Sequence, residues 1–266
     1  EPKITHLAKE TVVSQDVSAT GVSVTHASGK ELSATLLVGA DGRRSGTAER
    51  AGIRRNIREY GQTALVCAIK HEKPHGGVAH QYFMPAGPLA ILPLPQDRSS
   101  IVWSETTARA AEITALDDSG YLDVLRPRFG NFLGEISLAG DRYTYPLNLT
   151  TAQSFITDRV ALVGDAAQGV HPIAGQGLNA GLRDVAALAE VLTLARRRGQ
   201  DIGMQTVLEE YQRWRRFDRT TLGFATDTFN RLFSNDNTLL RMGSDLGMGI
   251  INAMPKLRRS FIREAA

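Results

Sequence analysis

Short runs of alternating apolar and polar residues over positions 4–38 predict strands joined by polar turns. Residues 21–25 alternate, and the Ser-Gly-Lys-Glu run at 28–31 is typical of a hairpin turn. The returning strand ends in the apolar run 35–38, which favours a strand buried on both faces. The Gly-Ala-Asp-Gly sequence at 39–42 then ends this strand.

A second strand-rich block follows, and turns rich in Pro, Gly and Gln-Asp separate its strands, as in an antiparallel sheet. Its predicted strands are residues 64–70, 79–84, 89–93 and 100–104. The later predicted elements are a helical region at 107–133, strands at 143–149 and 160–163, a helix at 177–198 and a helical tail at 204–264.

Two separate buried-strand patterns with a sheet between them predict one domain interrupted by another. The fold class we expect is α/β with an α+β insert: a partial Rossmann-like domain, an antiparallel-sheet domain and a helical tail. The expected segments are 1–58 and 151–200 for the Rossmann-like domain, 59–150 for the sheet domain and 201–266 for the tail.

Composition narrows the class of protein. The 266 residues suffice for one large or two modest domains, and 42% apolar with 22% charged residues is ordinary for a globular protein. A net charge of only +3, with scattered bases, argues against nucleic acid as a partner. The single cysteine, Cys67, excludes an internal disulfide and the usual zinc spacings, so no metal site is expected. Cys67 is interpreted as a buried apolar residue, with a reactive thiol as the alternative.

The sequence begins without Met and leads straight into a strand pattern, so we expect a fragment whose N-terminus was lost by cloning or proteolysis. No apolar run is long enough to span a membrane, and one cysteine suits a reducing compartment, so we expect a cytoplasmic location.

Two constellations carry candidate chemistry. In the first, an apolar strand is followed by Gly39, Asp41 and Gly42, where glycines let the chain reverse and a ligand approach the backbone. Ser45 is a good cap for a following short helix, and an ordinary strand-to-helix turn with a capping Asp remains the alternative interpretation.

The second constellation runs from residue 160 to 184 and is more specific. A buried strand leads to Gly164 and Asp165, a carboxylate that can accept hydrogen bonds from sugar-like hydroxyls at the end of a sheet. The loop 172–177 then presents backbone N–H groups at a helix start, which favours negative charge or an electron-rich ring edge. A helix start with small-residue packing is the alternative. His171 is interpreted as a structural histidine, with a titrating switch as the alternative.

Together these stretches resemble the flavin-binding motifs of the group A flavoprotein monooxygenases, which have the para-hydroxybenzoate hydroxylase fold. By that resemblance the first motif lies near the FAD pyrophosphate and is linked to NAD(P)H binding, and Asp165 binds the ribityl chain. The residues that the resemblance places along the isoalloxazine edge are Pro172, Gly175, Gln176, Gly177, Leu178 and Asn179.

The similarity narrows to the ubiquinone-biosynthesis hydroxylases through Gln168 and the run 171–177, the run 83–95, and the tail 211–218. Two features depart from that family. The sequence holds no Gly-x-Gly-x-x-Gly unit, so we expect weak or absent FAD binding by this fragment. An arginine expected after Ser45 is replaced by Ala48, with Arg43, Arg44 and Arg50 as nearby substitutes.

The resemblance implies an FAD-dependent monooxygenase that hydroxylates a polyprenylated phenol with O₂ through a flavin C4a-hydroperoxide. NAD(P)H or an electron-transfer partner reduces the flavin before it reacts with O₂. The flavin carries that chemistry, so no catalytic side chain is assigned. The predicted substrate pocket, for which core packing is the alternative interpretation, comprises Phe83, Met84, Leu92, Trp103 and His171.

Two other functions stay open: a hydroxylase of the same fold acting on a small soluble phenol, and a non-catalytic subunit that binds lipid or partners in a quinone-biosynthesis assembly. The basic, apolar segment 239–266 predicts docking to the inner face of the cytoplasmic membrane or to a partner protein, with cover for the protein's own core as the alternative.

Overall fold

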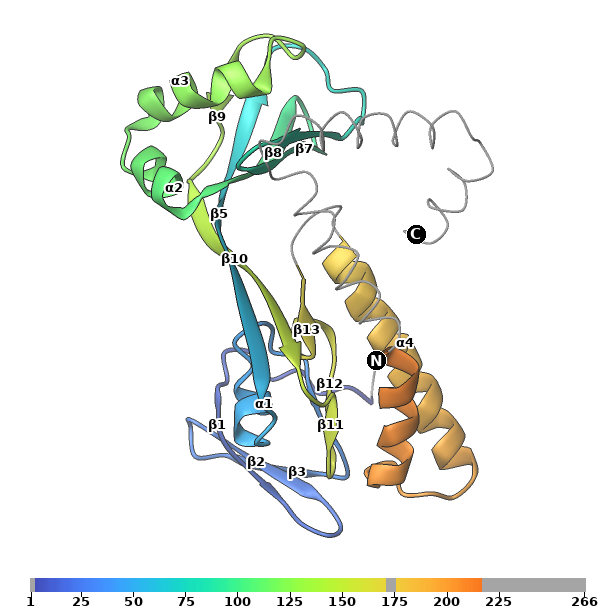
Figure 1. Cartoon of the computed structure of the whole chain (residues 1–266). Coiled ribbons are helices and arrows are strands. Elements are labelled where there is room, and N and C mark those ends of the chain that lie inside the picture. Colours follow the sequence, from blue (N-terminus) through green and yellow to red (C-terminus); the bar gives the residue numbers. More distant parts are fainter. Residues whose placement is uncertain (1–2, 171–175, 217–266) are drawn as a thin grey trace. The chain divides into compact units, whose positions relative to one another are not determined.

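The computed structural model describes residues 3–170 and 176–216, which form two compact units (Figure 1). The first unit comprises residues 3–58 and 149–216 within these limits, and the second comprises Glu59–Asn148. The predicted segment 239–266 lies outside the described residues. Residues 201–216, which the sequence assigned to a separate tail, belong to the first unit.

Three antiparallel strands open the first unit: β1 (Val12–Val17), β2 (Val22–His26) and β3 (Glu31–Ala34). The predicted hairpin turn joins β2 to β3, and Gly29 has a φ of 81° there, a conformation that glycine adopts without strain. The predicted hairpin is therefore confirmed, and β1 adds a third strand to it.

A second small sheet has the order β11 (Ile156–Thr157), β12 (Val160–Leu162), β4 (Leu37–Gly39), with β12 and β4 parallel. β12 is fully buried, as its sequence predicts. The expectation that β4 is buried on both faces is wrong, because Val38 is 41% exposed while its neighbour Gly39 is buried.

Helices cover the core of the first unit. They are α1 (Gly46–Arg50), α4 (Gln176–Arg197) and a helix that begins at residue 205 and is described to 216, together with the 3-10 turn η1 (Gly164–Ala166). Leu208 and Tyr211 of the last helix are buried beside Leu162, and the Tyr211 hydroxyl donates to the Leu162 carbonyl at 2.7 Å. This helix thus packs on β12, the strand that leads to Asp165.

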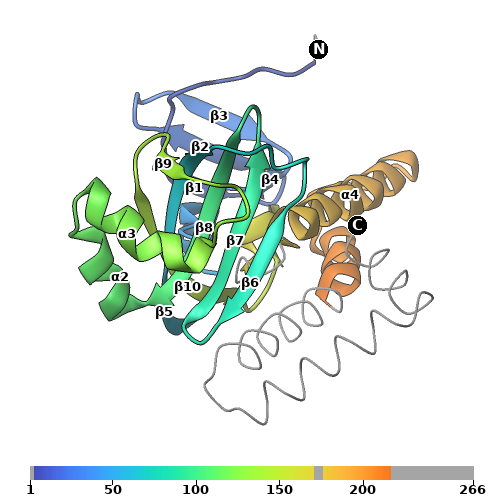
Figure 2. The ribbon, with the colours of Figure 1, turned by 90° about the horizontal axis from the view of Figure 1, so that it is seen from above.

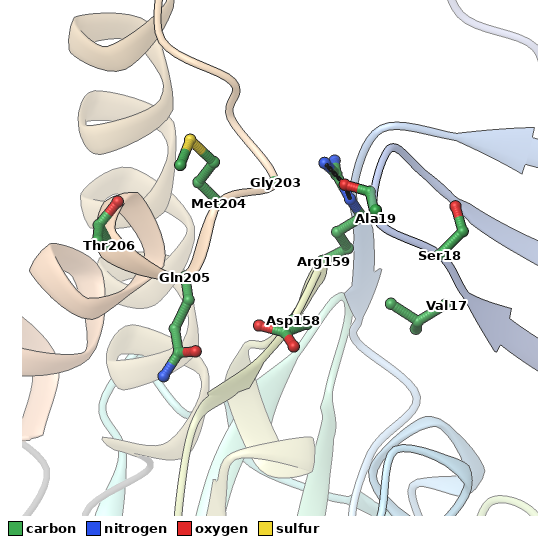
Figure 3. Close-up of a pocket in the computed structure, with 9 residues that line it drawn as sticks. All are labelled: Val17, Ser18, Ala19, Asp158, Arg159, Gly203, Met204, Gln205 and Thr206. Atoms are coloured by element: carbon green, nitrogen blue, oxygen red, sulfur yellow. Dashed lines mark hydrogen bonds between the residues drawn. The ribbon is translucent and has the colours of Figure 1, made fainter.

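Arg159, in the turn between β11 and β12, has a φ of 56° although it is not glycine. Its guanidinium donates to the carbonyls of Ala19 and Thr35 and to the Asp201 carboxylate. The hydrogen bond from Arg159 lowers the pKa of Asp201. A shallow cavity of about 480 Å³ lies beside Arg159 (Figure 3). The other residues lining it are Val17, Ser18, Ala19, Asp158, Gly203, Met204, Gln205 and Thr206.

An antiparallel sheet forms the centre of the second unit. Four of its seven described strands follow the order β5 (Arg55–His71), β8 (Arg98–Thr106), β7 (Gly87–Leu94) and β6 (His80–Met84). β9 (Ile136–Leu138) also pairs with β5, and the sheet continues beyond β5 through β10 (Tyr143–Ala152) and β13 (Gln168–Gly169). The chain enters this unit within β5 and leaves it within β10, whose end pairs with β13 in the first unit.

The helical region predicted at 107–133 is two helices, α2 (Thr107–Thr114) and α3 (Asp118–Phe129). The break arises because the Asp117 carboxylate accepts a hydrogen bond from the Gly120 amide at 2.8 Å and caps a new helix. Both helices pack on one face of the sheet and bury a core that includes Trp103, Tyr121 and Leu125 (Figure 2).

Candidate cofactor site

The Asp-Gly turn after β4 is held by its own side chains. Ser45 caps α1 and accepts a hydrogen bond from the Ala48 amide at 3.0 Å. The Asp41 carboxylate accepts from the Ser45 hydroxyl at 2.5 Å and from the Thr47 amide at 2.9 Å. Burial alone would raise the pKa of Asp41, but these hydrogen bonds outweigh it and lower the pKa. Asp41 therefore takes part in the strand-to-helix turn that the alternative interpretation describes, and its place near the FAD pyrophosphate stays a prediction.

The Gly-Asp turn lies at the end of β12, where the chain enters η1. Gly164 has a φ of 62°, which a side chain would strain. Its amide donates at 2.8 Å to Asp184, a fully buried carboxylate of α4 that also accepts from Arg215 at 2.9 Å. A Cβ at Gly181 would lie 3.3 Å from the Gly164 Cα, so the missing side chain lets α4 approach η1. These contacts fix the turn that carries Asp165.

Arg43 joins the two turns. Its Nε donates to the Asp165 carboxylate at 3.1 Å, and its Nη2 donates to the Val170 carbonyl. The side chains of Arg43 and Asp165 are 32% and 36% exposed, so a ligand can still reach the pair. The two constellations predicted separately from the sequence thus meet in one place of the first unit.

The start of α4 forms another side of this site. An added Cβ at Gly177 would lie 4.0 Å from Asp165 Oδ1, so this carboxylate oxygen lies near the first turn of the helix. Leu178 is 72% exposed and Asn179 is partly buried. Gln176 begins the helix. Pro172, Gly175 and His171 lie outside the described residues, so their predicted roles stay predictions.

The predicted substrate residues of the second unit lie on opposite faces of its sheet. Trp103 is fully buried in the core, where its Nε1 donates to Glu105 at 3.1 Å, and Met84 packs against the same core. Phe83 and Leu92 are 38% and 41% exposed. For Trp103 and Met84 the alternative of core packing describes their position, whereas Phe83 and Leu92 remain accessible to a ligand.

Sequence reasoning named Arg43 only as one of three substitute arginines and did not foresee its partner. The contact joins residues 122 positions apart, and a single sequence holds no signal for such a pair. In the described part of the chain no cluster of His, Cys, Asp or Glu could hold a metal ion. None of the helices described there is long and apolar enough to cross a membrane.

Comparisons with known proteins show the family to which this chain belongs. A family model described as "FAD binding domain" matches residues 5–218. The ubiquinone hydroxylase UbiL of Rhodospirillum rubrum is 45% identical over 258 residues, which are 97% of this chain and 60% of that protein. The 3-demethoxyubiquinol 3-hydroxylase of Escherichia coli is 34% identical over 89% of this chain and 60% of that protein.

Among solved structures, p-nitrophenol 4-monooxygenase PnpA of Pseudomonas putida has a TM-score of 0.78 at 19% identity, covering 96% of this chain and 66% of that one. That likeness shows a shared mixed α/β fold. The chain spans about 60% of the length of the curated relatives it matches. Since the family model covers most of the sequence, this chain belongs to the FAD binding domain family and is related to the ubiquinone hydroxylases.

Proposed function

We propose that this chain is the greater part of an FAD-dependent monooxygenase that hydroxylates the aromatic ring of a polyprenylated phenol in ubiquinone biosynthesis. The meeting of the Asp-Gly and Gly-Asp turns at Arg43 and Asp165 carries the proposal, because it brings together the two segments that resemble flavin-binding motifs, within a chain that matches an FAD binding domain. The relatives named as ubiquinone-pathway hydroxylases support the substrate class. In this view the first unit is an FAD/NAD(P)-binding Rossmann-like domain, and the sheet of the second unit binds the substrate.

The donor set around Asp165 fits FAD. A partly exposed carboxylate, one oxygen of which lies near the first turn of α4, accepts hydrogen bonds from the hydroxyls of a ribityl chain. The first amides of α4 have no acceptor within the helix, so they favour the electron-rich edge of the isoalloxazine. Gly177 leaves room beside that edge.

Bound FAD would activate O₂ for transfer to the ring, with NAD(P)H or an electron-transfer partner as reductant. The protein's own part is to hold the cofactor, orient the phenol and exclude water. Phe83 and Leu92, the two exposed apolar candidates of the second unit, would contact the substrate. We place the enzyme in the cytoplasm, with docking to the membrane as the way it meets a polyprenyl substrate.

Asp165→Ala in the full-length protein tests the cofactor site. A charge-assisted hydrogen bond contributes about 1.5–3 kcal/mol, so FAD affinity should fall roughly tenfold to a hundredfold. Fluorescence titration with FAD measures the change, and Asp16→Ala is the matched control because Asp16 is an exposed carboxylate on β1. Unchanged affinity in Asp165→Ala would remove this residue from the site.

Two other functions predict different results. A hydroxylase of a small soluble phenol would turn over p-hydroxybenzoate-like substrates better than a phenol with a prenyl chain. A non-catalytic subunit would show no reducible flavin after reconstitution of the full-length protein with FAD. O₂ consumption with NAD(P)H, compared between a short-chain prenylphenol and a small soluble phenol, together with the content of reducible flavin, therefore separates all three.

A further inference from the structure

We infer that Arg43 is the positioning residue of the flavin site: it fixes the Asp165 carboxylate so that its second oxygen is available to the ribityl chain. The inference rests on the proposed function and names a residue that the two motifs alone do not assign. Of the three arginines near the Asp-Gly turn, the structure selects this one by its contacts.

The other two arginines make no hydrogen bond to Asp165 within the described part of the chain. The Arg50 Nε donates to Gln15 at 3.4 Å, and a Cβ at Gly46 would lie 2.7 Å from the Arg50 guanidinium, so Arg50 lies back along α1. Arg44 is exposed. Arg43 alone of the three has a contact to Asp165 among the hydrogen bonds of the described residues.

The two oxygens of the Asp165 carboxylate have different surroundings. Asp165 Oδ2 accepts from the Arg43 Nε, whereas Oδ1 lies near Gly177 in the first turn of α4. A carboxylate held at one oxygen by a guanidinium that also donates to the Val170 carbonyl has fewer orientations open to it. The oxygen that faces the helix start is then preset for a hydroxyl, which lowers the entropic cost of cofactor binding.

Arg43 is itself held in place from three sides. Its backbone carbonyl accepts from the Arg55 Nη1 at 2.6 Å, and its Nη2 donates to the carbonyl of Val170. Its aliphatic stem passes Gly169, where an added Cβ would lie 3.0 Å from the Arg43 Cγ and Nε. Gly169 thus leaves the space that the arginine needs to reach Asp165.

The test is a double-variant cycle in the full-length protein, read by FAD titration. We expect Arg43→Gln to weaken FAD binding about tenfold, and Arg43→Gln with Asp165→Ala to bind no more than about threefold weaker than Asp165→Ala alone. Such coupling is expected of residues that act through one contact. Arg44→Gln, which removes the same charge one position away, should leave affinity unchanged.

Two further variants separate positioning from charge and from folding. Arg43→Lys keeps the charge but cannot make both contacts, so its affinity should lie between those of wild type and Arg43→Gln. Gly169→Ala keeps every charge and crowds the arginine stem, so it should weaken FAD binding by a few-fold with an unchanged melting temperature of the apoprotein.

Each result has one meaning. Wild-type affinity in Arg43→Gln, or fully additive losses in the double variant, overturns the role of Arg43 and leaves the proposed function intact. If the wild-type full-length protein binds no FAD, the proposed function fails, and the role of Arg43 fails with it.

Discussion

Cys67 shows how burial decides the behaviour of a single reactive group. The thiol is 3% exposed on β5 and lies 3.6 Å from the Tyr121 hydroxyl. Burial raises the pKa of Cys67 more than the hydroxyl and the Arg142 guanidinium lower it. Of the two interpretations open from the sequence, the buried apolar residue describes its surroundings.

We expect Cys67 in the native protein to react far more slowly with a thiol reagent at pH 8 than in the unfolded chain, because the reagent needs an exposed thiolate. Absorbance after mixing with dithionitrobenzoate measures the rate. An engineered surface cysteine at the exposed Ser28 serves as the reactive control. A native rate equal to that of this control would contradict the inertness of Cys67.

Among single elements, α1 depends most on capping. It has only five residues, and both Ser45 and Asp41 accept hydrogen bonds from amides of its first turn. A helix of this length is not stable without such contacts. The Asp-Gly turn that precedes it therefore has its shape set by side chains within seven positions of one another.

Asp41→Ala should lower the free energy of unfolding by up to about 1 kcal/mol at neutral pH. Folding lowers the pKa of this carboxyl. Its contribution to the free energy of unfolding is therefore present at a pH above its ordinary pKa of about 3.9, and it is lost as the pH falls through the lower pKa of the folded state. Urea titrations of both proteins between pH 3 and pH 7 should therefore converge at the acid end. If the difference in the free energy of unfolding between the two proteins stays constant over this range, the charge of Asp41 has no role.

The sequence predicted most elements but not the faces on which they place their residues. Turn chemistry and alternation located β6, β7 and β8 closely, since both are local properties of the chain. The strand predicted at 64–70 is only the second part of β5, which begins at Arg55. Whether Trp103 or Leu92 faces the helices depends on the cross-strand register, in which Trp103 lies opposite Leu65 and Leu89. The contact between Arg43 and Asp165 depends in the same way on tertiary structure.

At the scale of the whole molecule, the proposed cofactor site of the first unit is one half of a dinucleotide site. It contains Asp165 and the start of α4, which suit the flavin half, but the sequence holds no Gly-x-Gly-x-x-Gly unit for the adenosine diphosphate half. This chain spans about 60% of the length of the curated relatives.

The 266-residue chain should therefore carry little or no FAD after purification. Without the amides of a glycine-rich turn and its helix, the pyrophosphate lacks most of its expected donors. The ratio of flavin absorbance to protein absorbance measures the content, with the full-length protein as the reference. Stoichiometric flavin in the 266-residue chain would contradict this expectation.

The pairing of Asp184 with Arg215 sets a limit on how the gene can be shortened. A stop codon placed before position 215 removes no residue of the proposed flavin site. It does remove the Arg215 guanidinium, which donates to the fully buried Asp184 carboxylate 31 positions earlier. Breaking a buried ion pair in this way costs about 3–5 kcal/mol. The same carboxylate holds the Gly164 amide, so the loss would reach the turn that carries Asp165. C-terminal deletions of the full-length protein should accordingly lose flavin binding abruptly at this codon rather than by degrees.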